Sequence, residues 1–222
     1  MPKIVNVRRS VMEKDQLVAE KTRNDFAHRG VVMLNCIGSP GAGKTTLLEH
    51  TFSRLPFRAA VVEGDIATER DAERIRRSGV PAVQINTKGL CHLEAQLVQR
   101  ALAELPLDEL DLVVVENVGN LVCPAEFYLG EDRKIAISSV PEGDDKPLKY
   151  PHLFTISEVV LLTKTDLLPY IAFDRERFWE DVHSLNPGAV CLEVCAPSGE
   201  GMDSWIELLK EWCVKKNKAG IS

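Results

Sequence analysis

The stretch GSPGAGKTT, residues 38–46, decides the fold, because it lies between the apolar run VVMLNCI of residues 31–37 and a segment with helical spacing of leucines. Its form is GxxxxGK(S/T) between a buried strand and a helix, which is the pattern of a phosphate-binding loop. Glycines let backbone N–H groups close around a phosphate, and the following helix adds the positive end of its dipole. We therefore expect nucleotide contacts from nine consecutive residues: Gly38, Ser39, Pro40, Gly41, Ala42, Gly43, Lys44, Thr45 and Thr46.

Two residues of this loop and three farther along the chain have expected roles in hydrolysis. Lys44 supplies a charge for the β- and γ-phosphates, and Thr45 offers a hydroxyl to Mg²⁺. Mg²⁺ prefers oxygen ligands, so Asp65 and Glu116, each after an apolar strand, are the expected carboxylate ligands. We expect Asp65 to orient the attacking water and Gly119 to bring an N–H close to the γ-phosphate, which makes Lys44, Asp65, Glu116 and Gly119 the catalytic set. The alternative for each carboxylate is an ordinary acid at a strand end.

The bulk properties fit one α/β domain over residues 1–222, with a peripheral helix in residues 1–30. The net charge of -6 argues against general binding to nucleic acid or to an anionic membrane. No apolar run approaches the ~20 residues that span a bilayer, and no secretory signal is evident. We expect a cytoplasmic protein whose six cysteines are reduced thiols.

Apolar runs alternate with helical patterns along the chain, which is typical of a mainly parallel sheet with helices on both faces. Ligands of such folds bind at the carboxyl ends of the strands. The seven expected strands are residues 31–37, 59–64, 80–86, 112–116, 134–140, 158–164 and 188–194.

Capping and stop signals delimit the expected helices. The first opens at the capping box of Ser10 and Glu13 and ends near Gly30. We expect further helices from Lys44 to Pro56, from Thr68 to Gly79, from about residue 90 to 104, and at the C-terminus, where Trp205, Leu208, Leu209 and Trp212 form an apolar stripe. The proline- and charge-rich residues 141–151 are expected to form an ordered surface loop.

The carboxyl ends of the last two strands look like guanine-reading loops. Asp166 can accept hydrogen bonds from the N1–H and N2–H₂ groups of guanine, whereas adenine has no such donor pair. The stem of Lys164 can lie over the base, and the Ala196 N–H can donate to the guanine oxygen. Thr163 replaces the asparagine of the usual NKxD form, so we expect weaker guanine selectivity; the alternative for Asp166 is a helix cap. No arginine finger is evident, which predicts slow intrinsic hydrolysis of GTP.

A second candidate site consists of Cys91, His92 and Cys123. We expect Cys91 and His92 in the first turn of a helix, where the dipole lowers the thiol pKa and favours the thiolate that metals need. Thiolate and imidazole ligands suit Ni²⁺ or Zn²⁺. An adjacent Cys-His pair is a weak signal by itself, because neighbours on a helix diverge by about 100°.

Six segments in this order resemble the HypB family, the SIMIBI-class P-loop GTPases that help to insert nickel into NiFe hydrogenase. They are GSPGAGKTT, GDIATERDAERI, GLCHLEA, VVVENVGNLVCPAEF, PEGDDKPLKYP and TKTDLLPY. The resemblance covers residues 30–210 and implies that Cys91, His92 and Cys123 bind Ni²⁺ or Zn²⁺ at the interface of a GTP-dependent homodimer. It also implies two partners, a HypA-type nickel metallochaperone and the hydrogenase large-subunit precursor.

Three ligands per chain are too few for a closed structural zinc site, and an incomplete site suits metal transfer. Cys123 lies four residues beyond Gly119, a reach of at most ~14 Å, so we expect the GTP and GDP states to differ in nickel affinity. The alternatives are a urease-type accessory GTPase, a small-molecule kinase, and a nucleotide-gated zinc-binding regulator without useful hydrolysis.

Overall fold

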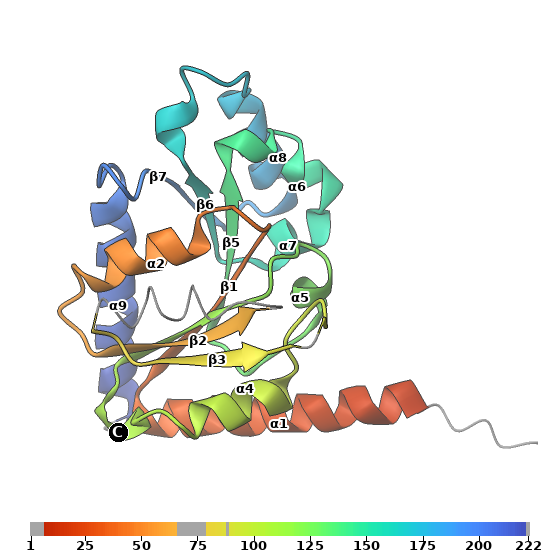
Figure 1. Cartoon of the computed structure of the whole chain (residues 1–222), viewed down its shortest axis with the longest axis vertical. Helices are drawn as coiled ribbons and strands as arrows, with labels where there is room; N and C mark the ends of the chain where they lie inside the picture. Colours follow the sequence, from red (N-terminus) through yellow and green to blue (C-terminus); the bar gives the residue numbers. More distant parts are fainter. Residues whose placement is uncertain (1–6, 66–78, 88, 221–222) are drawn as a thin grey trace, which may run out of the picture.

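Seven strands form one sheet in the part of the chain that the computed structural model describes, residues 7–65, 79–87 and 89–220 (Figure 1). They are β1 (Val32–Gly38), β2 (Ala59–Asp65), β3 (Ala82–Asn86), β4 (Leu112–Glu116), β5 (Arg133–Ser139), β6 (Val159–Thr163) and β7 (Val190–Val194). Their order across the sheet is β3-β2-β4-β1-β5-β6-β7, and every neighbouring pair is parallel. The parallel seven-stranded sheet expected from the sequence is confirmed.

The central strand β1 pairs with β4 on one side and with β5 on the other. β1, β4 and β6 are buried along their whole length, which explains why their sequences are continuous apolar runs rather than alternating ones. From β1 the chain first builds the β4 side of the sheet and then the β5 side. Ligands of open parallel sheets bind at such a change of direction, outside the carboxyl ends of the strands, so the loop that leaves β1 is well placed for one.

Helices α2 (Lys44–Phe52) and α9 (Met202–Gly220) cover one face of the sheet (Figure 1). The indole N–H of Trp205, a fully buried residue of α9, donates to Thr51 Oγ1 of α2 at 3.0 Å. This bond ties the C-terminal helix to the helix that follows the phosphate-binding loop. Trp205, Leu209 and Trp212 are buried, as expected for the apolar stripe.

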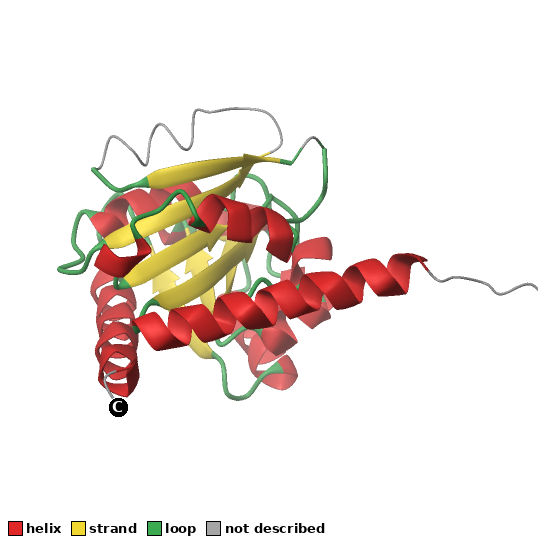
Figure 2. Ribbon diagram, turned by 90° about the horizontal axis from the view of Figure 1, so that it is seen from below, coloured by secondary structure: helices red, strands yellow, loops and turns green. Residues whose placement is uncertain are grey.

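The opposite face carries two groups of helices. Helices α1 (Val7–Arg29) and α4 (Ala95–Leu102) pack against each other over the β4 side, and α1 extends beyond the sheet in Figure 2. Helices α5 (Cys123–Glu126), α7 (Pro151–Ile156) and α8 (Arg175–Leu185) cover the β5 side. The remaining helical turns are η1 (Leu107–Glu109), η2 (Val140–Glu142), α6 (Lys146–Lys149) and η3 (Thr165–Leu167).

The expected start of the first helix at Ser10 is wrong, because α1 begins at Val7 and Ser10 lies inside it. A capping box marks a helix start only where the preceding residues cannot continue the helix, and the preceding Val-Arg-Arg can. Helix α1, expected to be peripheral, buries one side against the rest of the protein: Ala19 is 0% and Phe26 is 1% exposed. Gly30, with a φ of 71°, follows the helix end as expected.

The expected start of the fourth helix near residue 90 is also wrong, because α4 begins at Ala95. Asp15 of α1 accepts hydrogen bonds from the backbone N–H groups of Ala95 and Gln96, each at 3.0 Å. A carboxylate from a distant helix therefore caps α4, and no residue near 90 signals it locally. Consequently Cys91 and His92 lie in a bend before the helix.

Two further expectations concern connections between strands. The helix expected over residues 68–79 lies outside the described residues, apart from the turn at Gly79. Residues 141–151 are not one loop, because η2, α6 and the start of α7 occupy most of them. Prolines at the first positions of these turns fit the fixed φ that a helix start needs.

No helix among the described residues is long and apolar enough to cross a membrane.

Candidate nucleotide and metal sites

The loop between β1 and α2 has the backbone of a phosphate cradle. Gly41 and Gly43 have φ values of 78° and 87°, which L side chains rarely adopt. Gly38 is needed for a different reason, because a Cβ at this position would lie 2.5 Å from the Ile137 carbonyl oxygen of β5. The loop is therefore pressed against the neighbouring strand, and its N–H groups lie at the start of α2.

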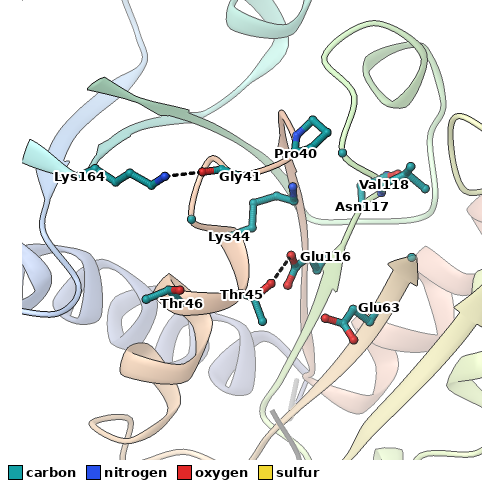
Figure 3. Close-up of a pocket in the computed structure, with 13 residues that line it drawn as sticks. Pro40, Gly41, Lys44, Thr45, Thr46, Glu63, Glu116, Asn117, Val118 and Lys164 are labelled. Carbon is teal, nitrogen blue, oxygen red and sulfur yellow. Dashed lines mark hydrogen bonds between the residues drawn. The ribbon is translucent and has the colours of Figure 1, made fainter. Parts of the chain in front are cut away.

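Two lysines bring positive charge to this loop (Figure 3). Lys44 is 7% exposed, and its ammonium group donates to the carbonyls of Gly38 and Ser39 at 3.2 and 3.1 Å. Lys164 has a left-handed backbone, with φ 57°, and donates to the Gly41 carbonyl at 2.6 Å. Lys44 and Lys164 therefore contact different carbonyls of the same loop, one from α2 and one from the end of β6.

A cleft of about 410 Å³ opens beside the loop and holds a pair of carboxylates. Glu63 of β2 and Glu116 of β4 are direct partners in the strand register, and both are buried. Thr45 Oγ1 donates to Glu116 Oε1 at 2.9 Å (Figure 3). The hydroxyl and the carboxylate oxygens form the hard donor set that Mg²⁺ prefers.

Glu63 was missed from the sequence, although a signal was present. Side chains alternate along a strand, so Glu63 shares a face with Asp65, the carboxylate ligand expected from the sequence. The backbone of Asp65 pairs with Asn86 at the end of β2, but its side chain lies outside the described residues, so its role stays a prediction. Asn117 was also missed, and it lines the cleft together with Gly119.

Gly119 lies against the phosphate-binding loop. A Cβ on Gly119 would lie 2.7 Å from Pro40 Cγ and 2.9 Å from Pro40 N. Any side chain here would displace the loop or the segment that carries Gly119. The contact fits the expected closeness of Gly119 to a bound phosphate.

The expected guanine-reading loops come together at the carboxyl ends of β6 and β7. Asp166 is exposed in η3, and Cys195 Sγ lies 3.3 Å from its Oδ1. Ala196 follows Cys195 in the chain and therefore lies near this carboxylate. Thr163, at the end of β6, contacts the phosphate-binding loop. Its hydroxyl is buried and donates to the Ala42 carbonyl at 2.6 Å, so it ties β6 to the phosphate-binding loop.

Cys91, His92 and Cys123 converge at the surface. Their ligand atoms all lie within 4.8 Å of one another. Cys91 Sγ lies 3.0 Å from Cys123 Sγ and 3.6 Å from His92 Nδ1. The imidazole stacks on the ring of Phe127, with centroids 3.7 Å apart and an interplanar angle of 14°. Two thiols and one imidazole at this separation suit a soft or borderline divalent ion.

The expected dipole effect on Cys91 is wrong, because the residue lies before α4 and not in its first turn. The pKa of Cys91 is raised, since its thiol donates to Cys123 and is partly desolvated. Burial lowers the pKa of His92, which favours the neutral imidazole that binds metals. The bend also allows the neighbouring residues Cys91 and His92 to face the same site, because its backbone need not follow the 100° rotation per residue of a helix.

The all-parallel sheet, the loop at its centre and the oxygen-lined cleft define a P-loop nucleotide-binding protein of the SIMIBI type. A family model described as CobW/HypB/UreG, nucleotide-binding domain, matches residues 32–193. The chain belongs to this family and, within it, to the HypB proteins.

Three known proteins illustrate the likeness. The hydrogenase maturation factor HypB of Escherichia coli (strain K12) is 48% identical over 210 residues, which cover 94% of this chain and 72% of the relative. A crystal structure of HypB from Helicobacter pylori in complex with nickel has a TM-score of 0.88 and 37% identity, with 91% of this chain and 96% of that chain covered. FtsY of Thermotoga maritima shares the fold alone, with a TM-score of 0.54 and 14% identity over 81% of this chain and 68% of that chain.

Proposed function

We propose that this chain is a GTP-hydrolysing metallochaperone that assists nickel insertion into NiFe hydrogenase. The observation that carries the proposal is the closeness of the two sites. Gly119 abuts Pro40 of the phosphate-binding loop, and Cys123 follows four residues later on the same segment. On the other side, a Cβ on Gly64 at the cleft would lie 2.9 Å from the side chain of Leu93, two residues after Cys91. Both segments that carry the proposed metal ligands therefore contact or contain residues that line the nucleotide cleft.

GTP is the proposed nucleotide. Asp166 would accept the two N–H donors of guanine, the Ala196 N–H would meet its oxygen, and Lys164 would cover the base. The donor set of Thr45, Glu116 and Glu63 fits Mg²⁺, with Asp65 as a further expected ligand. When bound, Mg²⁺ would neutralise charge on the phosphates.

Hydrolysis would depend on positioning and charge. Lys44 would stabilise the negative charge that develops on the β- and γ-phosphates, and a strand-end carboxylate, Asp65 or Glu63, would orient the attacking water. Slow intrinsic hydrolysis is proposed, because the sequence shows no evident arginine finger.

Nickel is the proposed cargo. Cys91, His92 and Cys123 offer three ligands, so a position stays open to water, to a second subunit or to the next carrier. Zn²⁺ would compete for the same ligands. We propose that GTP favours a homodimer across this site and that the GTP and GDP states hold nickel with different affinities.

The proposed partners are a HypA-type nickel metallochaperone and the hydrogenase large-subunit precursor, and the proposed location is the cytoplasm. A urease-type accessory role is a second candidate. It is favoured by one finding, the name "Hydrogenase/urease maturation factor HypB" of the Helicobacter pylori relative, which is 37% identical over 213 residues covering 94% of this chain and 88% of that protein.

Phosphate release from GTP and from ATP, measured with and without Ni²⁺, tests the activity. We expect slow release from GTP, well below ~10 s⁻¹, and little from ATP. Preference for ATP would favour the small-molecule kinase, and absence of release would favour the zinc-binding regulator.

Nickel binding is tested with Cys91→Ala, which should lose the ion, against Cys213→Ala, whose thiol is buried in the core. Light scattering with a non-hydrolysable GTP analogue should detect the dimer.

A further inference from the structure

Asn35 is a polar residue in the middle of the apolar strand β1, and it is 0% exposed. Alternate residues of a strand share a face, so Asn35 points toward the face that α4 and α5 cover, as Met33 and Ile37 do. Its side-chain oxygen accepts from Asn117 Nδ2 at 3.1 Å, and its own Nδ2 donates to Glu131 Oε1 at 3.2 Å. Asn117 and Glu131 are 2% and 4% exposed, so the three side chains form a buried polar chain.

Glu131 and Lys134 extend this chain to the backbone around α5. The second carboxylate oxygen of Glu131 accepts from the Leu129 N–H at 2.7 Å, and Oε1 lies 3.5 Å from Lys134 Nζ. Lys134 Nζ donates to the carbonyls of Ala125 and Phe127 at 3.0 and 2.8 Å. The ammonium group thus holds Ala125, near the end of α5, and Phe127, the residue that follows the helix.

The buried polar chain has one end at the nucleotide cleft and the other end at the proposed metal site. Asn117 lines the nucleotide cleft with Gly119. Cys123 is the first residue of α5, and the Phe127 ring, whose carbonyl Lys134 holds, stacks on the His92 imidazole. Polar side chains therefore connect the cleft to the segments that carry Cys123 and stack on His92. This connection is separate from the covalent one, which runs along residues 117–123.

A short helix needs such anchors. α5 has four residues, and so short a helix is not stable on its own hydrogen bonds. Its position depends on what holds its carbonyl groups. The Glu131 side chain is 2% exposed and that of Lys134 is 14% exposed. A salt bridge that is largely buried is weak evidence for stability, so the role of the pair is inferred from the geometry that it fixes.

We propose that Glu131 and Lys134 are positioning residues of the nickel site. They hold residues 123–127 so that Cys123 and His92 converge on one ion, and through Asn35 and Asn117 they link this geometry to the nucleotide cleft. The inference rests on the proposed function, because nickel is the ion whose ligands are positioned.

Competition titration with Ni²⁺ and a chromophoric chelator, in GDP and in a non-hydrolysable GTP analogue, tests this role. Glu131→Gln and Lys134→Met are expected to weaken nickel binding by about 10–100-fold, the usual effect of residues that orient metal ligands, and to bring the affinities in the two nucleotide states closer together. GDP affinity should stay within about twofold of wild type, since neither side chain contacts the cleft. Lys134→Arg keeps a cation that donates to two carbonyls and should regain most of the nickel affinity.

Asp132→Asn is the matched control. It is the same carboxylate-to-amide change on the neighbouring residue, whose ion pairs run to Arg23 and Lys216 of α1 and α9 and not to α5. Nickel binding should survive this change, and the thiolate-to-nickel absorption band should alter in the Glu131 and Lys134 variants alone.

Wild-type nickel affinity in both Glu131→Gln and Lys134→Met would overturn the inference and leave the proposed function intact. So would an equal loss of nickel and GDP affinity together with a fall in melting temperature, because that pattern indicates general destabilisation. If Glu131→Gln does not fold, Lys134→Met against Lys134→Arg decides. Absence of nickel binding at Cys91, His92 and Cys123 in the wild-type protein would overturn the proposed function and the inference together.

Discussion

Replacing Thr163 by valine would test whether one hydroxyl holds the phosphate-binding loop in place. Valine keeps the branched shape, so no cavity forms, and the change removes the bond from Thr163 Oγ1 to the Ala42 carbonyl at 2.6 Å. Thr163 is 4% exposed, so this carbonyl would be left without that donor in a site that water does not readily reach. A buried acceptor without a partner costs about 1–3 kcal/mol. For a domain of this size, such a loss corresponds to a fall in melting temperature of about 2–4 °C per kcal/mol.

Thermal unfolding and titration with a fluorescent GDP analogue would measure the two consequences of Thr163→Val. We expect a lower melting temperature and weaker GDP binding, because the carbonyl belongs to the nucleotide loop itself. Thr155→Val is the matched control: its exposed hydroxyl donates to the Pro151 carbonyl at 2.9 Å within α7, and its loss should cost less than about 0.5 kcal/mol. If Thr163→Val matched the wild type in both measurements, the reasoning that β6 braces the loop would be refuted.

Three further changes test individual residues. Gly119→Ala places a Cβ 2.7 Å from Pro40 and should weaken GDP binding about tenfold, whereas Gly188→Ala, whose nearest neighbour is 3.6 Å away, should not; equal affinities in a titration would contradict this. Asp15→Ala removes the cap of α4 and should lower the free energy of unfolding in urea by about 1–2 kcal/mol; an unchanged midpoint would show that the cap is dispensable. Burial raises the pKa of Cys213 to about 12, so the folded state favours the neutral thiol; this contribution is complete below the unfolded pKa near 9 and is lost as pH rises through about 12. Between pH 9 and 12 the stability of Cys213→Ala should therefore fall less steeply than that of the wild type, and parallel curves would refute the assignment.

The metal site was predictable in its residues but not in its geometry. Cys91, His92 and Cys123 were picked out by their types and by the family resemblance, and the structure brings all three within 4.8 Å. The predicted helical turn around Cys91 was wrong because the cap of α4 is Asp15, about eighty residues earlier in the chain. Helix propensity reads only neighbours in sequence, so a start signal supplied by a distant helix is invisible to it.

The nucleotide site divides in the same way. Lys44 and Thr45 were placed by a motif whose spacing dictates the backbone. Glu63 was missed because its importance comes from the register of β2 against β4, which places it beside Glu116. Strand order and register depend on how whole faces pack, and one strand's sequence does not contain them.

The sequence by itself determined the local structures of this protein. The glycines of residues 38–46 dictate the loop, because they permit backbone angles that other residues rarely adopt. The continuous apolar runs dictate strands that are buried on both faces of a parallel sheet. Both effects act between residues that are close in sequence. Only the tertiary structure decided how these parts meet: Thr163 against the loop carbonyl, Gly119 against Pro40, and the buried polar chain through Asn35 and Glu131. These contacts join residues far apart along the chain, and they form when the order of the strands is set by the packing of the sheet between its two layers of helices.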